Sequence, residues 1–136
     1  MMNKFIIRII FFVLLLSSCS VFTTLYDNNE YIQYIKMISL SEDAIKLCYS
    51  EDTDVLLEYI SDIHDQTTFL VNYTKYFPEN EEAYNISIDL NDMIYAMLYR
   101  YQTEETVSPV YCEIKLKLFA DNVKKIALAT SAKSRR

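Results

Sequence analysis

The chain contains no glycine in 136 residues, and its only two prolines are Pro78 and Pro109. Tight hairpin turns depend on glycine, most often as Asn-Gly or Asp-Gly, and neither pair occurs here. Long stretches without a breaker predict helices instead. Phosphate-binding loops, dinucleotide fingerprints and nucleophile elbows also require glycine at fixed positions, so these enzyme classes are excluded together.

Four segments have helical periodicity and end at plausible breaks. The first predicted helix runs from a cap at Asn28 or Asn29 to about Cys48, and the second from a cap at Ser50 to about Tyr76. The third runs from about Glu81 to Tyr101, and the fourth starts at Ser108-Pro109 and frays before Thr130. Four helices with short connections pack most simply as an up-down-up-down bundle. The predicted fold class is therefore all-α, with one bundle domain over residues 29–130.

Apolar residues repeat along each predicted helix at the spacing of one face, which identifies the side expected in the core. The first helix is expected to use Tyr31, Ile35, Ile38, Ile45 and Cys48, and the second Leu56, Tyr59, Ile60, Ile63, Thr67, Leu70 and Val71. The third is expected to use Ala83, Ile86, Leu90, Met93, Ile94 and Met97, and the fourth Cys112, Leu116, Phe119, Val123 and Ile126.

The first 18 residues have the parts of a secretory signal, because Lys4 and Arg8 accompany an apolar run that ends in small residues. The run is about a dozen residues, whereas a membrane-spanning helix needs about 20. Its last four residues, Leu16–Cys19, resemble the lipobox of bacterial lipoproteins. The resemblance implies cleavage before Cys19, acylation of Cys19 and, with Ser20 following, residence in the outer membrane. Residues 19–28 then form a lipidated tether that faces the periplasm. An uncleaved anchor, or a secretory signal with a chance cysteine, is the alternative.

Charge is distributed unevenly along the chain. Residues 20–123 carry 19 acidic and 6 basic side chains, whereas all five charged residues of 124–136 are basic. An acidic body argues against nucleic-acid binding, which requires positive charge against the phosphates. Residues 131–136 are expected to be a disordered basic tail, either solvated or in contact with anionic lipid.

The topology brings two cysteines together. In an up-down bundle the end of the first helix and the start of the fourth lie at the same end, and these positions hold Cys48 and Cys112. In the oxidising periplasm two cysteines so placed are expected to form a disulfide. The alternative is a pair of buried free thiols.

No catalytic or metal-binding pattern is present. His64 is the only histidine, and its neighbours Asp62 and Asp65 do not face it on a helix. No Cys/His cluster has zinc spacing, and no serine has a recognisable base beside it. We expect neither enzymatic activity nor a cofactor, a metal or a small-molecule substrate.

The informative feature is apolar surface beyond the core faces. The first helix adds Met37, Leu40, Ala44 and Leu47 beside its main face. The third and fourth helices carry second rows, which are Tyr84, Ile88, Tyr95 and Tyr99, and Tyr111, Ile114 and Leu118. A tyrosine-rich exposed patch is typical of a binding surface. We expect the second rows of the third and fourth helices to line a groove for a partner helix, with additional core packing or a dimer contact as the alternative.

A family resemblance rests on two segments that each lead to a cysteine. The first is Tyr31–Lys36 followed by Ala44–Cys48, and the second is Met97–Thr103 followed by Val110–Cys112. These segments resemble the PulS/OutS pilotins of type II secretion, although the glycine and tryptophan usual between the cysteines of that family are absent. The resemblance implies a lipoprotein chaperone that binds the C-terminal tail of a secretin subunit and pilots it to the outer membrane. A periplasmic immunity lipoprotein and a phage or plasmid entry-exclusion lipoprotein are the alternatives.

Lipid attachment at Cys19 gives the first testable prediction. The wild-type protein should fractionate with the outer membrane and carry acyl chains by mass spectrometry, whereas Cys19→Ala should carry none. A wild-type protein that is unacylated and soluble in the periplasm would contradict the lipobox interpretation.

Overall fold

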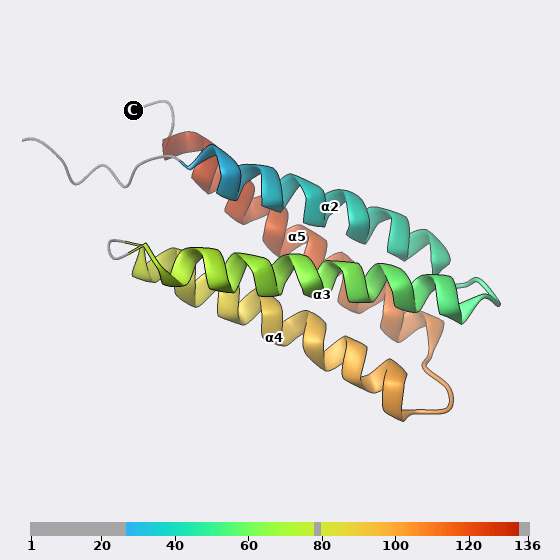
Figure 1. Ribbon diagram of the computed structural model, residues 1–136. Coiled ribbons are helices and arrows are strands. Elements are labelled where there is room, and N and C mark those ends of the chain that lie inside the picture. Colours follow the sequence, from blue (N-terminus) through green and yellow to red (C-terminus); the bar gives the residue numbers. More distant parts are fainter. Residues whose placement is uncertain (1–26, 78–79, 134–136) are drawn as a thin grey trace, which may run out of the picture.

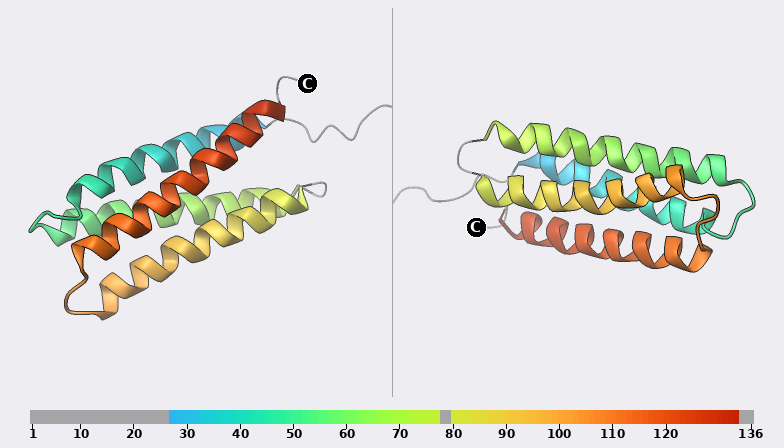
Figure 2. Two further views of the ribbon diagram at one scale, coloured as in Figure 1. Left: turned by 180° about the vertical axis from the view of Figure 1, so that it is seen from behind. Right: turned by 90° about the horizontal axis from the view of Figure 1, so that it is seen from below.

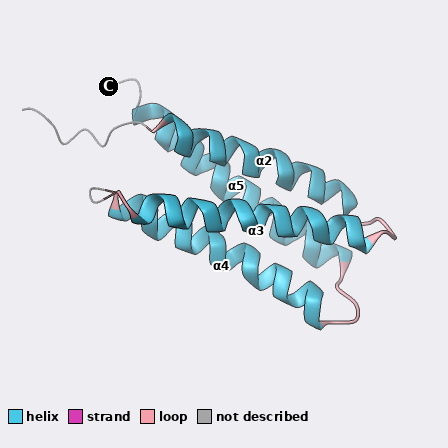
Figure 3. Cartoon of the chain, viewed as in Figure 1, coloured by secondary structure: helices cyan, strands magenta, loops and turns pink. Residues whose placement is uncertain are grey.

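The computed structural model describes residues 27–77 and 80–133, which form four helices. They are α2 (Asn28–Leu47), α3 (Thr53–Lys75), α4 (Glu81–Thr103) and α5 (Pro109–Lys133), shown in Figure 1. The predicted signal segment, the lipobox with Cys19, and residues 134–136 lie outside the described residues. No strand occurs in the described ranges, and none of their helices is long and apolar enough to cross a membrane (Figure 3).

Successive helices run in opposite directions and pack as a ring, with α2 against α3, α3 against α4, and α5 returning to α2 (Figures 1 and 2). The starts of α2 and α4 and the ends of α3 and α5 share one end of the bundle. This end is named the tether end below. The predicted all-α up-down bundle is confirmed.

Aspartates cap the first two helices, and the sequence-based assignment of both caps was wrong. Asp27 accepts hydrogen bonds from the backbone N–H groups of Asn29 (2.8 Å) and Glu30 (3.4 Å), so the helix is capped one residue before the predicted Asn28. Asp52 accepts from the N–H of Val55 at 3.3 Å, whereas Ser50 lies outside the helix and accepts from the N–H of Asp52. A carboxylate at the cap also interacts favourably with the helix dipole, which periodicity alone does not reveal.

The fourth helix is longer than expected. α5 begins at Pro109 as predicted, but it continues to Lys133, three residues beyond the predicted end of the bundle domain at residue 130. Thr130 is buried, and its packing accounts for the continuation of the helix past a point where the sequence becomes polar. Residues 131–133 of the predicted basic tail are therefore helical.

The core faces of three helices largely match the prediction. α3 buries Leu56, Ile60, Ile63, Thr67 and Leu70, while Tyr59 and Val71 are half-buried. The predicted residues of α4 and α5 are buried except for Ile86, Met93 and Ile126, which are half-buried at the edge of the core.

The core face of α2 differs from the prediction. The helix buries Glu30, Tyr34, Met37, Ser41 and Ala44, and Cys48 follows at its cap, whereas Ile35 is 45% exposed. The buried stripe runs between the predicted main face and the second apolar row, so Ile38 and Leu40 on either side of it are both half-buried. The apolar periodicity of α2 was misleading because polar side chains occupy part of the buried stripe. Ser41 is one of them, and its buried hydroxyl donates a 2.7 Å hydrogen bond to the carbonyl of Met37.

Polar contacts also join α3 to α4. The hydroxyls of Thr74 and Ser87 lie 2.9 Å apart in the buried interior, and the Asn91 amide donates to the hydroxyls of Thr67 and Thr68 at 3.0 Å. Each buried hydroxyl of this layer therefore has a partner, and the layer fixes the register of the two helices.

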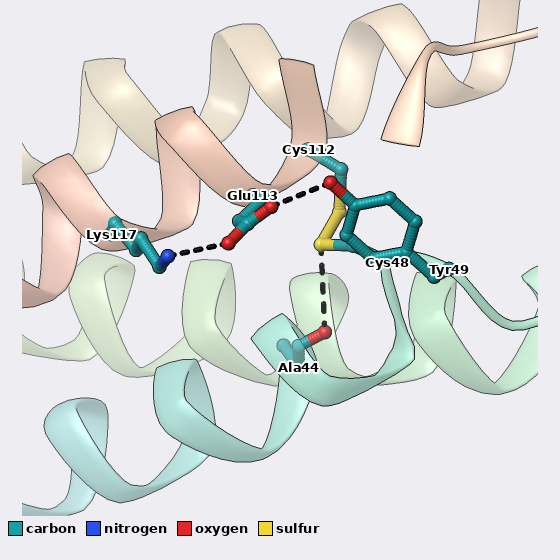
Figure 4. A network of polar contacts seen from close by, with 6 residues as sticks. All are labelled: Ala44, Cys48, Tyr49, Cys112, Glu113 and Lys117. Atoms are coloured by element: carbon teal, nitrogen blue, oxygen red, sulfur yellow. Dashed lines mark hydrogen bonds and ion pairs between the residues drawn. A yellow bond between two sulfur atoms is a disulfide. The ribbon is translucent and has the colours of Figure 1, made fainter. Parts of the chain in front are cut away.

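The predicted disulfide between Cys48 and Cys112 is present and links the end of α2 to the first turn of α5, with a Cα–Cα distance of 5.6 Å. An exposed polar network surrounds it (Figure 4). The Tyr49 hydroxyl donates to the Glu113 carboxylate at 2.6 Å, and Lys117 forms an ion pair with the same carboxylate. The hydrogen bond from Lys117, and then that from Tyr49, lower the pKa of Glu113.

Reduction of this disulfide should destabilise the fold measurably. The disulfide joins two residues that are 64 positions apart, and for a loop of this length the chain-entropy model gives a stabilisation of the folded state of roughly 4 kcal/mol. Measured stabilisations are often smaller. Urea denaturation of the Cys48→Ser, Cys112→Ser variant should show that loss, and Cys19→Ser should serve as a matched control with no loss. Equal midpoints for all three proteins would contradict a structural role for the disulfide.

Candidate functional site

The seam between α4 and α5 is the most open part of the bundle. These two helices contact each other far less than the other three neighbouring pairs do. In both views of Figure 2 the two helices run side by side along the seam. Along this seam Ile86, Met93 and Ile126 are only half-buried.

Three adjoining cavities follow this seam, with volumes of about 240, 290 and 100 Å³ from the tether end to the connecting loop. The first two share Ile86, Lys125 and Ile126, and the last two share Met93, so they form one continuous depression. We name this depression the α4/α5 groove. Its apolar lining consists of Ala83, Ile86, Leu90, Met93, Ile94, Ala96, Met97, Tyr111, Phe119, Ile126 and Ala129.

The two walls of the groove carry opposite charges. α4 contributes Glu82 and Asp89, whereas α5 contributes Lys115, Lys125 and Lys133. No ion pair joins these walls within residues 27–77 and 80–133. A chain segment lying in the groove would therefore meet an acidic edge on one side and a basic edge on the other.

A buried acid lies at the floor of the groove near the tether end. Glu30 and Tyr34 of α2 reach the first cavity, and the Tyr34 hydroxyl donates to the Glu30 carboxylate at 2.6 Å. Glu30 lies in the first turn of α2, where the helix dipole stabilises a negative charge. Burial, and then the contact with Glu30, raise the pKa of Tyr34 well above its ordinary value, so this tyrosine is neutral.

The opposite end of the groove is closed. The Arg100 guanidinium of α4 lies 4.1 Å from the centre of the Tyr111 ring of α5, a cation–π contact that spans the seam. Farther along, the Asn122 amide lies 3.7 Å from the Met93 sulfur. The first contact joins the walls beside the connecting loop, and the second joins them midway along the two helices.

The structure does not bring the two predicted partner-binding rows together. On α4, Tyr95 is 52% exposed and packs beside His64 of α3, with ring centres 5.7 Å apart, and Tyr99 follows it at 6.3 Å. Tyr84 and Ile88 of the same row are half-buried. None of these four residues lines the α4/α5 groove, because their side of α4 faces α3.

The row on α5 has a different position. Tyr111 lines the groove beneath Arg100, whereas Ile114 and Leu118 are exposed outside it. Of the seven residues predicted to bind a partner, only Tyr111 is thus part of the groove, and the role of the others stays a prediction.

Sequence reasoning missed the groove because its lining was assigned to the core. Ile86, Met93 and Ile126 belong to the predicted core faces, and they become groove residues because α4 and α5 do not close over them. One signal was present in the sequence: Lys115 and Lys125 lie beside the apolar face of the fourth helix, where a fully closed seam would disfavour them.

No group of three potential metal ligands occurs in the described part of the chain. Comparisons with protein-family models, with curated proteins and with solved structures found no match. The assignment of a function therefore depends on the groove and on the resemblance of the sequence segments.

The Tyr34–Glu30 contact yields a stability prediction. Tyr34→Phe removes the donor to a buried carboxylate and should lower the unfolding free energy by about 1–3 kcal/mol at neutral pH. Tyr84→Phe should cost less, because Tyr84 is only half-buried and, within the described residues, hydrogen-bonds through its backbone and not through its hydroxyl. Urea denaturation of both variants tests the difference.

The same tyrosine predicts a pH dependence. Because its pKa is raised on folding, its contribution is complete below the ordinary tyrosine pKa of about 10 and is lost as the pH rises above that value. The stability difference between the wild type and Tyr34→Phe should shrink above about pH 10. A constant difference up to pH 11 would contradict this account.

Proposed function

We propose that this protein is a lipid-anchored chaperone of the outer membrane that binds an amphipathic helix from a partner protein in the α4/α5 groove. The partner that best fits is the C-terminal tail of a secretin subunit, as the resemblance to type II secretion pilotins implies. The observation that carries the proposal is the apolar depression along the seam where α4 and α5 make the fewest contacts.

The shape of the groove favours a helical ligand. Its lining residues recur along α4 at spacings of three and four, as in Ala83, Ile86, Leu90, Met93 and Met97. A helix laid along this row would place its own apolar residues between them, which is the usual mode of helix-in-groove recognition. Such a segment is disordered alone and folds on contact, so part of the contact energy is spent on ordering it.

The charged walls determine the orientation of the ligand. Basic residues on one edge of the bound helix would lie beside Glu82 and Asp89, and acidic residues on the other edge would lie beside Lys115, Lys125 and Lys133. Electrostatic complementarity of this kind fixes register and suppresses wrong partners more than it increases affinity. A peptide with the two charged edges exchanged should therefore bind more weakly.

Filling the groove should weaken binding of the partner helix without unfolding the protein. Ala129 of α5 lines the groove and is exposed, so Ala129→Phe should occupy the first cavity and weaken the affinity for a secretin C-terminal peptide from the same organism about tenfold or more. Ala132→Phe is a matched control, because Ala132 is exposed on the same helix outside the groove. Titration calorimetry measures both, and circular dichroism verifies their fold.

Two outcomes would count against the proposal in different ways. If the wild type does not bind the secretin tail, the pilotin assignment is wrong. If it binds and Ala129→Phe binds equally well, the groove is not the site. In that case Tyr95→Ala and Ile114→Asp, which alter the two exposed rows, should show whether those rows bind the partner instead.

A further inference from the structure

A second exposed apolar surface lies at the tether end, away from the groove. The rings of Phe69 and Tyr73 in the last turns of α3 stack with centres 5.8 Å apart, and the ring of Phe77, just past the helix, lies tilted against Tyr73 at 5.0 Å. Phe69 and Phe77 are each nearly half exposed, and the neighbouring Tyr76 is 78% exposed. We name these four residues the aromatic ladder. None of them lines the α4/α5 groove.

The ladder is attached directly to the point where the N-terminal chain enters the bundle. The Tyr73 hydroxyl donates a hydrogen bond to the Asp27 carboxylate, and this bond is the main cause of the raised pKa of Tyr73. The same carboxylate caps α2. The aromatic side chains are therefore held beside the first described residue of the chain, at the end where α2 begins and α3 finishes (Figure 1).

The length of chain before Asp27 limits what this surface can reach. Only residues 20–26 separate Cys19 from Asp27, and a fully extended chain of eight steps spans about 28 Å at most. The 25 residues of α5 are about 37 Å long. A lipid on Cys19 thus keeps the tether end near the bilayer, while the far end of the bundle lies a full helix length away.

The geometry points to the aromatic ladder as a membrane contact: Phe69, Tyr76 and Phe77 insert into the interfacial layer of the bilayer to which Cys19 is anchored. The inference rests on the proposed lipid tether and is independent of the secretin partner. Phenylalanine and tyrosine suit this layer because their rings are apolar, and the tyrosine hydroxyls stay in contact with water or the protein. With the ladder in the interface, the protein would lie in a fixed orientation instead of turning freely on its tether.

The charge near the ladder argues for insertion of rings over attraction to anionic headgroups. Lys75 is exposed in the last turn of α3, but Glu81 and Glu82 are exposed in the first turn of α4 at the same end. The adjoining ends of α3 and α4 are therefore not cationic, and the basic residue Lys133 at this end belongs to α5, which within the described residues does not pack against α3. Contact with the membrane should survive high salt, which screens exposed charges and leaves apolar burial intact.

The absence of tryptophan from the chain permits a direct test. Tyr76→Trp places the only tryptophan of the chain in the ladder, and Val55→Trp places it in the first turn of the same helix, about 30 Å away. Val55 is also exposed, at 38%, which makes it a matched control. The acylated proteins are reconstituted in phosphatidylcholine vesicles with and without brominated phosphatidylcholine, a lipid that quenches tryptophan on contact.

The Tyr76→Trp protein should show blue-shifted emission that is quenched at least twofold by the brominated lipid, also in 0.5 M NaCl, and the Val55→Trp protein should show neither effect. Adding Phe69→Ser and Phe77→Ser to Tyr76→Trp should remove most of the quenching. Unquenched emission from Tyr76→Trp would overturn the inference. Quenching that persists without the two phenylalanines would overturn it as well, because proximity through the tether would then suffice.

A separate arm distinguishes failure of the lipid tether from failure of the membrane contact. Mass spectrometry of the purified protein shows whether Cys19 carries acyl chains. If it carries none, the same proteins starting at Cys19 are coupled through that thiol to a maleimide lipid in the vesicles, since Cys48 and Cys112 are joined to each other. With this coupled lipid as the anchor, quenching of Tyr76→Trp is again the expected result, and unquenched emission again overturns the inference.

Discussion

The packing of α2 against two neighbours is the constraint on which the rest of the structure depends. α2 lies between α3 and α5, and the Cys48–Cys112 disulfide joins its end to the first turn of α5. At the other end, the Asp27–Tyr73 hydrogen bond joins its start to the last turns of α3. An ion pair between Glu42 and Lys124 adds a further link to α5. α3 and α5 are thus both held by α2, and α4 is held mainly by α3.

This arrangement explains why one seam is open. α4 is fixed to α3 by a buried polar layer that includes Thr74, Ser87 and Asn91, and a polar layer tolerates little sliding because each group would lose its partner. α5 is fixed to α2 by the disulfide. Because each of these helices packs mainly on another neighbour, they contact each other little. The side-chain contacts between them include Arg100 with Tyr111 beside the connecting loop and Asn122 with Met93 midway along the helices. The α4/α5 groove is the space that remains.

The proposed partner site in the groove and the proposed membrane contact at the aromatic ladder lie on different sides of the bundle. The groove lies between α4 and α5 and combines an apolar floor with two oppositely charged walls, which suits a helix of matching pattern. The ladder lies on α3 beside the chain entry and is apolar without a complementary charge. A membrane contact on α3 would leave the groove accessible, so the two proposals are compatible with a chaperone that binds its client while it is anchored.

The sequence by itself determined the all-helical class, the four helices to within a few residues, and the pairing of Cys48 with Cys112. The absence of glycine, the 3.6-residue periodicity and the Pro109 start are local properties, and the up-down topology follows from short connections. Only the tertiary structure decided which sides of the helices are covered. Periodicity gives the apolar direction of each helix, but it gives neither the distance between two helices nor their rotation. For this reason Ile86, Met93 and Ile126 changed from expected core to groove lining, and the stripe of α2 moved to a line that includes Glu30 and Ser41.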